Sequence, residues 1–208
     1  MRVVLFGATG MIGSRILQEL LSRGHQVTAV VRNPEKVAAG SATVVKGDVT
    51  DAASVAAAAK GAEAAISAYA PPLQQPETIL AATRSLLTGL QTAGVRRLIA
   101  VGGAGSLEVA PGVQLVDTPE FPEAWKAIAL AHRDVLPILR GASLDWTALS
   151  PAAFIQPGER TGKFRLGGTQ LVVDQKGESR ISAEDYAVAL VDELESPKHL
   201  RQQFTVAY

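Results

Sequence analysis

Three glycines near the start of the chain have the spacing that holds a diphosphate. Gly7, Gly10 and Gly13 follow a short apolar run and precede a helical pattern. A turn of this kind lets backbone N–H groups approach an anion, and the helix N-terminus adds positive partial charge. We predict that the turn binds a dinucleotide through these residues: Gly7, Ala8, Thr9, Gly10, Met11 and Ile12. The alternative is a structural turn that holds no ligand.

The end of the second apolar run selects the nucleotide. An NAD site usually carries Asp or Glu there, about 20 residues past the glycines, to bind the ribose 2′-hydroxyl. This chain has Val31, Arg32 and Asn33 instead, with Lys36 one turn later. Arg32 and Lys36 can pair with a 2′-phosphate. We therefore predict a preference for NADP(H) of roughly tenfold to a hundredfold, with NAD(H) still accepted. The alternative for Arg32 is a solvated surface arginine.

Residues after the other predicted strands complete the expected cofactor site. Asp48 and Val49 follow the third strand, where the carboxylate can accept from the adenine amino group or close a turn. Strand carboxyl ends line the ligand crevice of such sheets, so residues after the later strands should flank the ribose and nicotinamide. These are Ser67, Ala68, Tyr69, Gly102, Gly103, Pro151, Ala152 and Phe154. The alternative for Phe154 is a core aromatic.

The elements that position these residues alternate between strands and helices. Apolar runs predict strands at 2–6, 27–31, 43–45, 64–67, 97–101, 146–149 and 204–206. Helical patterns lie at 11–23, 52–60, 77–93, 124–140 and 182–194, with Thr50 or Asp51 and Ser182 as caps. Pro137 should kink its helix or end it early, and 107–122 is predicted to be a loop. The pattern predicts an α/β fold with a doubly wound, Rossmann-type parallel sheet.

The chain should form one domain over residues 1–208, because no polar linker divides it. Residues 151–208 are expected to be mostly a small substrate-side C-terminal lobe, with the last helix and strand. Within it, 163–174 resembles a hairpin or an extended excursion. The segment from Gly158 to Gly177 should form one wall of a substrate pocket.

Composition restricts both the partners and the chemistry. Twenty basic and twenty acidic residues cancel, so no large electrostatic footprint for nucleic acid or anionic lipid is expected. The chain has no cysteine, which excludes disulfides, cysteine-ligated metals and thiolate nucleophiles. Its three histidines are too scattered to predict a metal site. No apolar stretch approaches the length of a membrane span, and a cytoplasmic protein is the expectation.

Stretches along nearly the whole chain resemble the atypical short-chain dehydrogenases/reductases. They are Gly7-Ala8-Thr9-Gly10-Met11-Ile12-Gly13, Arg32, Gly47-Asp48-Val49, Val101-Gly102-Gly103-Ala104-Gly105-Ser106, Asp145-Trp146-Thr147 with Pro151, Gly158-Glu159-Arg160-Thr161-Gly162, and Ile181-Ser182-Ala183-Glu184-Asp185-Tyr186-Ala187. Within that group the chain resembles small NAD(P)H-binding proteins named NADH-flavin reductases, relatives of biliverdin-IXβ/flavin reductase. The resemblance implies a Rossmann fold that binds NADP(H).

The larger catalytic members of that group use a Tyr-x-x-x-Lys pair, in which the lysine lowers the pKa of the tyrosine. Here Leu73 and Leu190 stand four residues after Tyr69 and Tyr186, and Tyr208 is the last residue of the sequence. The pair is therefore missing, and sugar epimerase or dehydratase chemistry is not expected.

Three other side chains are candidates for supporting catalytic roles. Lys126 can neutralise a phosphate or an accumulating anion, or it can be a surface lysine. His132 stands where biliverdin-reductase-like relatives carry a histidine, and it can donate a proton near the nicotinamide or simply pack. Ser106 can hydrogen-bond the substrate or cap a turn.

A flat conjugated acceptor can take a hydride without a side-chain acid, because it delocalises the incoming charge and water protonates it later. We therefore expect an NADPH-preferring oxidoreductase that reduces a flavin or a similar acceptor, used as a diffusing substrate. Two alternatives stay open. One is a non-catalytic NADP(H)-binding redox sensor with a docking surface on 107–120, and the other is a reductase of a small quinone or ketone. The protein should be a monomer or a homodimer.

Overall fold

The computed structural model describes residues 1–36 and 42–208. Its strands are β1 (Arg2–Phe6), β2 (Gln26–Val31), β3 (Thr43–Lys46), β4 (Ala64–Ser67), β5 (Arg97–Val101), β6 (Glu108–Ala110), β7 (Val113–Gln114), β8 (Asp145–Ser150), β9 (Phe154–Gln156), β10 (Arg165–Gly167), β11 (Arg180–Ser182) and β12 (Gln202–Ala207). Its α-helices are α1 (Met11–Ser22), α2 (Ala52–Ala59), α3 (Thr78–Ala93), α4 (Glu123–Arg140) and α5 (Ala183–Glu195). Short 3₁₀ turns occur at η1 (Pro34–Lys36), η2 (Ala104–Ser106) and η3 (Leu115–Asp117).

The main sheet has the strand order of a doubly wound fold. Eight strands run β10-β12-β8-β5-β4-β1-β2-β3, and all neighbours pair in parallel except β10 with β12. From β1 the chain builds outward to β2 and β3, and then crosses back to β4 and builds in the opposite direction. The order therefore reverses between β1 and β4, which is where ligands bind in such sheets.

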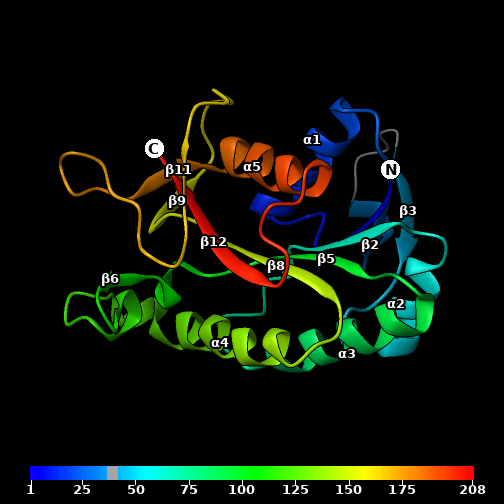
Figure 1. Ribbon diagram of the computed structural model, residues 1–208. Helices are drawn as coiled ribbons and strands as arrows, with labels where there is room; N and C mark the ends of the chain where they lie inside the picture. Colours follow the sequence, from blue (N-terminus) through cyan, green and yellow to red (C-terminus); the bar gives the residue numbers. More distant parts are fainter. Residues whose placement is uncertain (37–41) are drawn as a thin grey trace.

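Helices cover both faces of the sheet (Figure 1). Helices α1 and α5 pack together on one face, and α2, α3 and α4 line up on the other. Successive residues of β1 alternate between these layers, as strand geometry requires. Leu5 joins the core with Tyr186 of α5, while Phe6 packs with Leu90 of α3. The apolar run in β1 reflects this burial on both faces.

The local signals for helix ends are confirmed. The side chain of Asp51 accepts a hydrogen bond from the N–H of Ala53 at 3.0 Å and so caps α2. Ser182 caps α5 in the same way, accepting from the N–H of Asp185 at 3.0 Å. Gly94 follows α3 in the left-handed conformation with φ of +76°. Each of these ends depends on residues within four positions in the sequence, which is why the pattern alone predicted them.

The helix predicted over 124–140 is confirmed, because α4 runs to Arg140 and Pro137 does not end it early. Pro137 removes one backbone hydrogen bond within the last turn, and the burial of Val135, Leu136 and Leu139 against the sheet offsets that loss. The segment 107–122 is more than the predicted loop, because β6 and β7 pair as a short antiparallel hairpin within it.

The chain after β8 makes a small second sheet before it returns to the main one. Strands β9 and β11 pair in parallel, with Phe154 opposite Arg180 and Gln156 opposite Ser182. Between them, β10 pairs antiparallel with β12 and becomes the edge of the main sheet. The predicted excursion around Gly167 and Gly168 is thus an edge strand, and it pairs with a strand about 40 residues further along.

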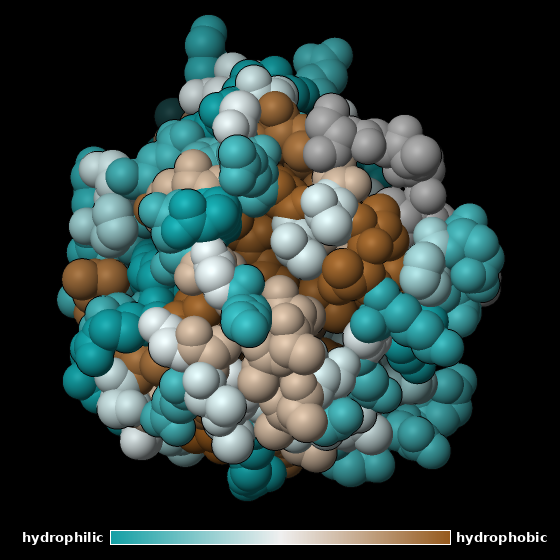
Figure 2. Space-filling view, turned by 90° about the vertical axis from the view of Figure 1, so that its right-hand side faces the viewer, coloured by the Kyte–Doolittle hydropathy of each residue, from teal (hydrophilic) through white to brown (hydrophobic). Residues whose placement is uncertain are grey.

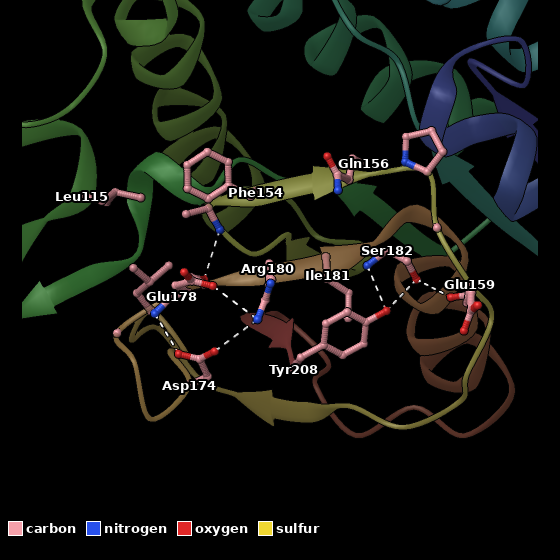
Figure 3. Close-up of a pocket in the computed structure, with 16 residues that line it drawn as sticks. Leu115, Phe154, Gln156, Glu159, Asp174, Glu178, Arg180, Ile181, Ser182 and Tyr208 are labelled. Atoms are coloured by element: carbon pink, nitrogen blue, oxygen red, sulfur yellow. Dashed lines mark hydrogen bonds and ion pairs between the residues drawn. The ribbon is translucent and has the colours of Figure 1, made fainter.

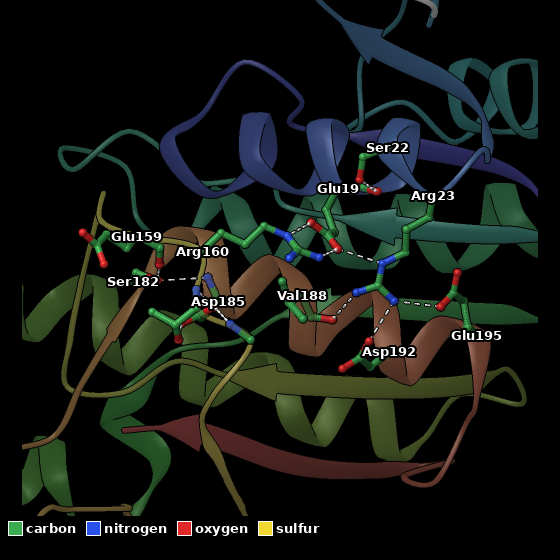
Figure 4. A network of polar contacts seen from close by, with 12 residues as sticks. Glu19, Ser22, Arg23, Glu159, Arg160, Ser182, Asp185, Val188, Asp192 and Glu195 are labelled. Carbon is green, nitrogen blue, oxygen red and sulfur yellow. Dashed lines mark hydrogen bonds and ion pairs between the residues drawn. The ribbon is translucent and has the colours of Figure 1, made fainter.

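A buried carboxylate joins this C-terminal segment to the helix after the glycine turn (Figure 4). The side chain of Glu19 in α1 is 5% exposed and accepts hydrogen bonds from Arg160 at 2.8 Å and from Arg23 at 2.7 Å. Arg23 also pairs with Asp192 and Glu195 of α5. The hydrogen bonds from Arg160 are the largest cause that lowers the pKa of the Glu19 carboxyl, with those from Arg23 adding to them.

We expect Glu19→Gln to lower the free energy of unfolding by about 2–3 kcal/mol at pH 7, because two guanidinium groups lose a charged acceptor. The folded pKa of Glu19 lies below its ordinary value of 4.5. The contribution of the Glu19 carboxylate to the free energy of unfolding is therefore fully present above pH 4.5, and it is lost as the pH falls through the folded pKa. Urea unfolding of both proteins from pH 7 to pH 3 should show the difference shrinking below pH 4.5. A difference independent of pH would contradict the ionic role.

Two surface properties bear on partners. None of the helices within residues 1–36 and 42–208 has both the length and the apolar character needed to cross a bilayer. At the β3 edge of the sheet, Val44 and Val45 are only half-buried. Figure 2 shows this side of the molecule, where apolar residues reach the surface near the middle and polar residues surround them.

Candidate functional site

A cleft of about 300 Å³ lies at the carboxyl ends of β1, β2 and β4, where the strand order reverses. It brings together eight of the eighteen predicted cofactor residues and several that the sequence did not indicate. The eight are Gly7, Thr9, Gly10, Arg32, Asp48, Val49, Ala68 and Tyr69. Its lining is Phe6, Gly7, Thr9, Gly10, Val30, Val31, Arg32, Gly47, Asp48, Val49, Thr50, Ala68, Tyr69, Ala70, Pro72, Gln75 and Thr78. Pro72, Gln75 and Thr78 enter through the β4–α3 connection, and no short motif marks them.

The three glycines of the turn have different reasons to be glycine. Gly7 has a φ of +83°, and a Cβ there would lie 2.4 Å from the carbonyl oxygen of Ala68. A Cβ on Gly13 would lie 2.0 Å from the carbonyl oxygen of Gly7. Gly10 is different, because its φ is −73° and its Cβ would meet only the Gly7 oxygen, at 3.5 Å. Folding explains why Gly7 and Gly13 are glycine, whereas nothing in the fold crowds a Cβ on Gly10.

The start of α1 offers unpaired donors at this open space. Gly10 is its N-cap, no side chain caps the helix, and no acidic residue occupies the first turn. The first N–H groups of a helix have no intrahelical acceptor and carry positive partial charge. Of the remaining predicted residues, Thr9 and Met11 are exposed, whereas Ala8 is buried and Ile12 half-buried. This arrangement fits a diphosphate held by backbone groups.

Arg32 stands at the mouth of the same cleft, directly after β2. The residue is exposed and lines the cleft beside Asp48. The N–H and hydroxyl of Thr50 lower the pKa of the Asp48 carboxyl, and the charge of Arg32 adds to that effect. The carboxylate of Asp48 accepts both hydrogen bonds from Thr50, at 2.9 and 2.7 Å, so it closes a turn. Lys36 lies in η1, and its side chain falls outside the described part of the chain.

The residues after β4 and β5 approach their neighbours closely. Ser67, Ala68 and Tyr69 are half-buried, and the Tyr69 hydroxyl lies 3.4 Å from the Thr78 hydroxyl. A Cβ on Gly102 would lie 2.9 Å from the Ser150 hydroxyl oxygen, and one on Gly103 would lie 2.8 Å from the His132 Cβ. Packing of α4 against the end of β5 therefore requires glycine at position 103, whereas at Gly102 the closest atom is a serine hydroxyl that can rotate away.

The three candidate catalytic side chains have different surroundings. Ser106 is buried, and its hydroxyl donates to the Gly103 carbonyl at 3.2 Å and accepts from Gln203 at 2.8 Å. This geometry favours the turn-capping role over contact with a substrate. Lys126 is half-buried on the first turns of α4. His132 packs against Gly103, and burial lowers the pKa of its imidazole to about 4.

We expect the His132 ring to be neutral at pH 7 and to titrate with a midpoint near pH 4. The unfolded chain takes up this proton near pH 6.5, so protonation disfavours folding as the pH falls from 6.5 toward 4. Proton NMR of the imidazole resonances, assigned by comparison with His132→Gln, measures the midpoint. A midpoint near 6.5 would show that the ring is solvated and able to carry a proton at neutral pH.

Among the residues that the structure describes, no tyrosine forms an acid–base pair with a lysine. Tyr186 is fully buried in α5 and donates a hydrogen bond to the Leu149 carbonyl at 2.6 Å, and burial raises the pKa of its phenol. The hydroxyl of Tyr208 lies 2.8 Å from that of Ser182. Tyr69 contacts Thr78 in the cleft at the ends of β1, β2 and β4. The partners of the three phenols are thus a backbone carbonyl for Tyr186 and side-chain hydroxyls for Tyr208 and Tyr69.

A larger cavity, of about 860 Å³, lies beyond the end of β8 (Figure 3). Pro151 and Ala152 are buried and do not line it, whereas Phe154 lines it and is 74% exposed, so Phe154 is not a core aromatic. The predicted wall from Gly158 to Gly177 does line this cavity, at Gly158, Glu159, Leu171, Asp174 and Gly177. The strand β11, which supplies Arg180, Ile181 and Ser182, also lines it and was not predicted.

Comparison with known proteins gives a family match over most of the chain. Residues 7–197 match a family described as NAD(P)H-binding. A curated relative, the uncharacterized protein YwnB of Bacillus subtilis strain 168, is 41% identical over 99% of this chain and 98% of its own length.

Several solved structures share the whole fold. A candidate exported protein from Burkholderia pseudomallei is 52% identical, with a TM-score of 0.92 and full coverage of both chains. A candidate epimerase from Bacteroides thetaiotaomicron is 43% identical, with a TM-score of 0.93 over 100% of this chain and 96% of its own. SP1627, a candidate NADH-flavin reductase from Streptococcus pneumoniae TIGR4, is 35% identical, with a TM-score of 0.89 over 100% and 99% of the chains. These names differ, so the reaction has to be argued from the site.

Proposed function

Because the chain belongs to the NAD(P)H-binding family, we propose that it is an NADPH-preferring reductase of a flat, conjugated acceptor such as a flavin. The family and the reductase among its structural neighbours support an oxidoreductase. The preference for NADPH rests on Arg32 beside the cleft and on the absence of an acid at Val31, Arg32 and Asn33. When bound, NADPH supplies a hydride.

One observation carries the choice of acceptor: within the described part of the chain, none of the three phenols is paired with a lysine. Tyr186 is in the core, Tyr208 is bonded to the Ser182 hydroxyl, and Tyr69 faces Thr78. A saturated ketone or sugar needs a positioned acid at the oxygen that gains the proton. A flavin spreads the negative charge over its rings and takes its proton from water. The site residues therefore need only bind and orient two rings and exclude side reactions.

The same observation argues against epimerase chemistry in this chain, although one neighbour bears that name. Oxidation of a sugar hydroxyl during epimerisation needs a base at that hydroxyl. Of the predicted catalytic side chains, Ser106 has its hydroxyl engaged by Gly103 and Gln203, and burial lowers the pKa of the His132 imidazole to about 4. Neither matches a tyrosine–lysine pair.

A second candidate function is a non-catalytic NADP(H) sensor that docks to a protein partner. It is favoured by the β6–β7 hairpin, where Val109 and Val113 are 43% and 42% exposed. Exposed apolar side chains on a projecting hairpin suit contact with another protein.

The decisive experiment follows NADPH absorbance with purified protein and FMN, FAD or riboflavin, and repeats each trace with NADH. We expect saturable, flavin-dependent oxidation that is faster with NADPH at limiting cofactor. Tight NADPH binding without oxidation by any of the three flavins would replace the reductase with the sensor.

A further inference from the structure

The segment 157–163, which we call the strap, lies between β9 and β10 on the surface of the molecule. All seven of its residues are exposed. The nearest apolar anchors on either side, Ile155 and Phe164, are half-buried and pack against the core. The strap is therefore fixed at both ends, whereas apolar burial contributes little to holding the residues between them.

A buried carboxylate of α5 holds the middle of the strap. Asp185 is fully buried, and its side chain accepts hydrogen bonds from the N–H groups of Thr161 and Gly162 at 2.8 and 2.7 Å. It also accepts from the Thr161 hydroxyl at 2.5 Å, and the Tyr208 hydroxyl lies 2.9 Å from the same carboxylate. When the strap lifts, Asp185 exchanges the strap's donors for water. The closed and open states therefore differ by much less free energy than the sum of these bonds.

Two further contacts of the strap also end on carboxylates. Arg160 donates to Glu19 of α1 through two nitrogens, each at 2.8 Å (Figure 4). The Gly158 N–H donates to Glu184 of α5 at 2.7 Å. Hydrogen bonds to charged acceptors are stronger than neutral ones, so the closed position is favoured. A segment held by exposed polar contacts can nevertheless open locally while the apolar core stays folded.

The closed strap covers part of the cavity beyond β8 (Figure 3). Pro157, Gly158 and Glu159 of the strap line that cavity, and so do Ser182 and Tyr208. Ser182 is 5% exposed, and its hydroxyl donates to the Glu159 carbonyl at 2.7 Å. A Cβ on Gly158 would lie 3.0 Å from the Ser182 Cβ. The strap backbone therefore lies directly against Ser182 and shields it from solvent.

From these contacts we propose that the strap opens and closes as one unit and thereby gates the cavity beyond β8. Lifting 157–163 removes one wall of the cavity and exposes Ser182 and the Asp185 carboxylate, while the sheet and the helices stay folded. The gate controls access to the cavity. It goes beyond the proposed function, because it holds whether or not the chain reduces a flavin and whatever ligand the cavity takes.

The test is thiol labelling, since the chain has no cysteine of its own. Ser182→Cys places a single thiol beneath the strap, and its rate of reaction with dithiobis-nitrobenzoate reports how often the strap is open. Adding Thr161→Val removes one donor to Asp185 and should speed the labelling about tenfold. Thr92→Val is the matched control, because the exposed Thr92 hydroxyl donates to the Thr88 carbonyl within α3. It should leave the labelling rate unchanged.

A second reporter separates opening of the strap from unfolding of the whole chain. Ser106→Cys places the thiol at a site that is also 5% exposed but lies in η2, outside the strap. Local opening exposes little surface, so low urea should not change the labelling rate of Ser182→Cys. The Ser106→Cys thiol is reached through unfolding, so it should label more slowly and its rate should rise steeply with urea.

Equal labelling rates and equal urea dependence at the two positions would overturn the gate, and so would a Ser182→Cys rate that Thr161→Val does not change. Because Ser182 also caps α5, hydrogen exchange on the wild-type chain gives a check without that substitution. The amide protons of Gly158, Thr161 and Gly162 bond two different carboxylates, yet opening as one unit requires a common protection factor, well below that of β1. Three unequal factors would show that the contacts break separately.

Discussion

Replacing Arg32 with alanine should weaken NADPH binding by about tenfold to a hundredfold and change NADH binding by less than about twofold. Arg32 follows β2 directly, is exposed, and lines the cleft beside Asp48. A hydrogen-bonded charge pair with a 2′-phosphate contributes roughly 1.5–3 kcal/mol, and every 1.4 kcal/mol corresponds to about tenfold in affinity. NADH lacks that phosphate, so its affinity should not fall by a comparable factor.

The measurement is a titration of each reduced cofactor by its fluorescence, for wild type and variants in the same buffer. Arg32→Lys should keep part of the preference, because the charge remains but the bidentate geometry is lost. Arg96→Ala is the matched control: Arg96 precedes β5 at the opposite edge of the sheet and is 72% exposed. Equal weakening of NADPH and NADH by Arg32→Ala would refute the assignment of Arg32 to the 2′-phosphate.

Replacing Gly10 with alanine should weaken NADPH binding at least tenfold and leave the melting temperature within about 2 °C of wild type. A Cβ on Gly10 has only an ordinary contact with the Gly7 carbonyl oxygen, at 3.5 Å, and the φ of −73° is accessible to alanine. The fold therefore tolerates the methyl group. A diphosphate drawn to the first N–H groups of α1 would meet it, because its binding requires close approach to this backbone.

Two other glycines provide matched controls for Gly10. Gly13→Ala places a Cβ 2.0 Å from the Gly7 carbonyl oxygen, so the turn must move and both stability and NADPH binding should fall. Gly141→Ala, just after α4, meets only ordinary contacts at 3.6 and 3.7 Å and should change neither property. If Gly10→Ala bound NADPH as well as wild type, the diphosphate would not lie against the start of α1.

Much of the fold could be predicted because its signals are local. Asp51 and Ser182 cap helices whose first N–H groups lie two or three residues away. The apolar run in β1 indicates burial on both faces, and the glycine turn after it indicates a helix N-terminus at an anion site. The early helix end that Pro137 would favour does not occur. Its helix continues because Leu136 and Leu139 are buried against distant strands, which a local propensity cannot register.

The functional residues divide in the same way. Sequence alone determined the parts of the site that one short segment builds: the Gly7–Gly13 turn and Arg32 at the end of β2. Tertiary structure decided the rest. Ser106 is bonded to Gln203, 97 positions away, and Arg160 to Glu19, 141 positions away. The cavity beyond β8 is lined by residues that range from Leu115 to Tyr208, with Phe154 exposed among them. Backbone conformation and capping depend on neighbours in sequence, whereas burial, charge balance and hydroxyl partners depend on which segments the packed sheet brings together.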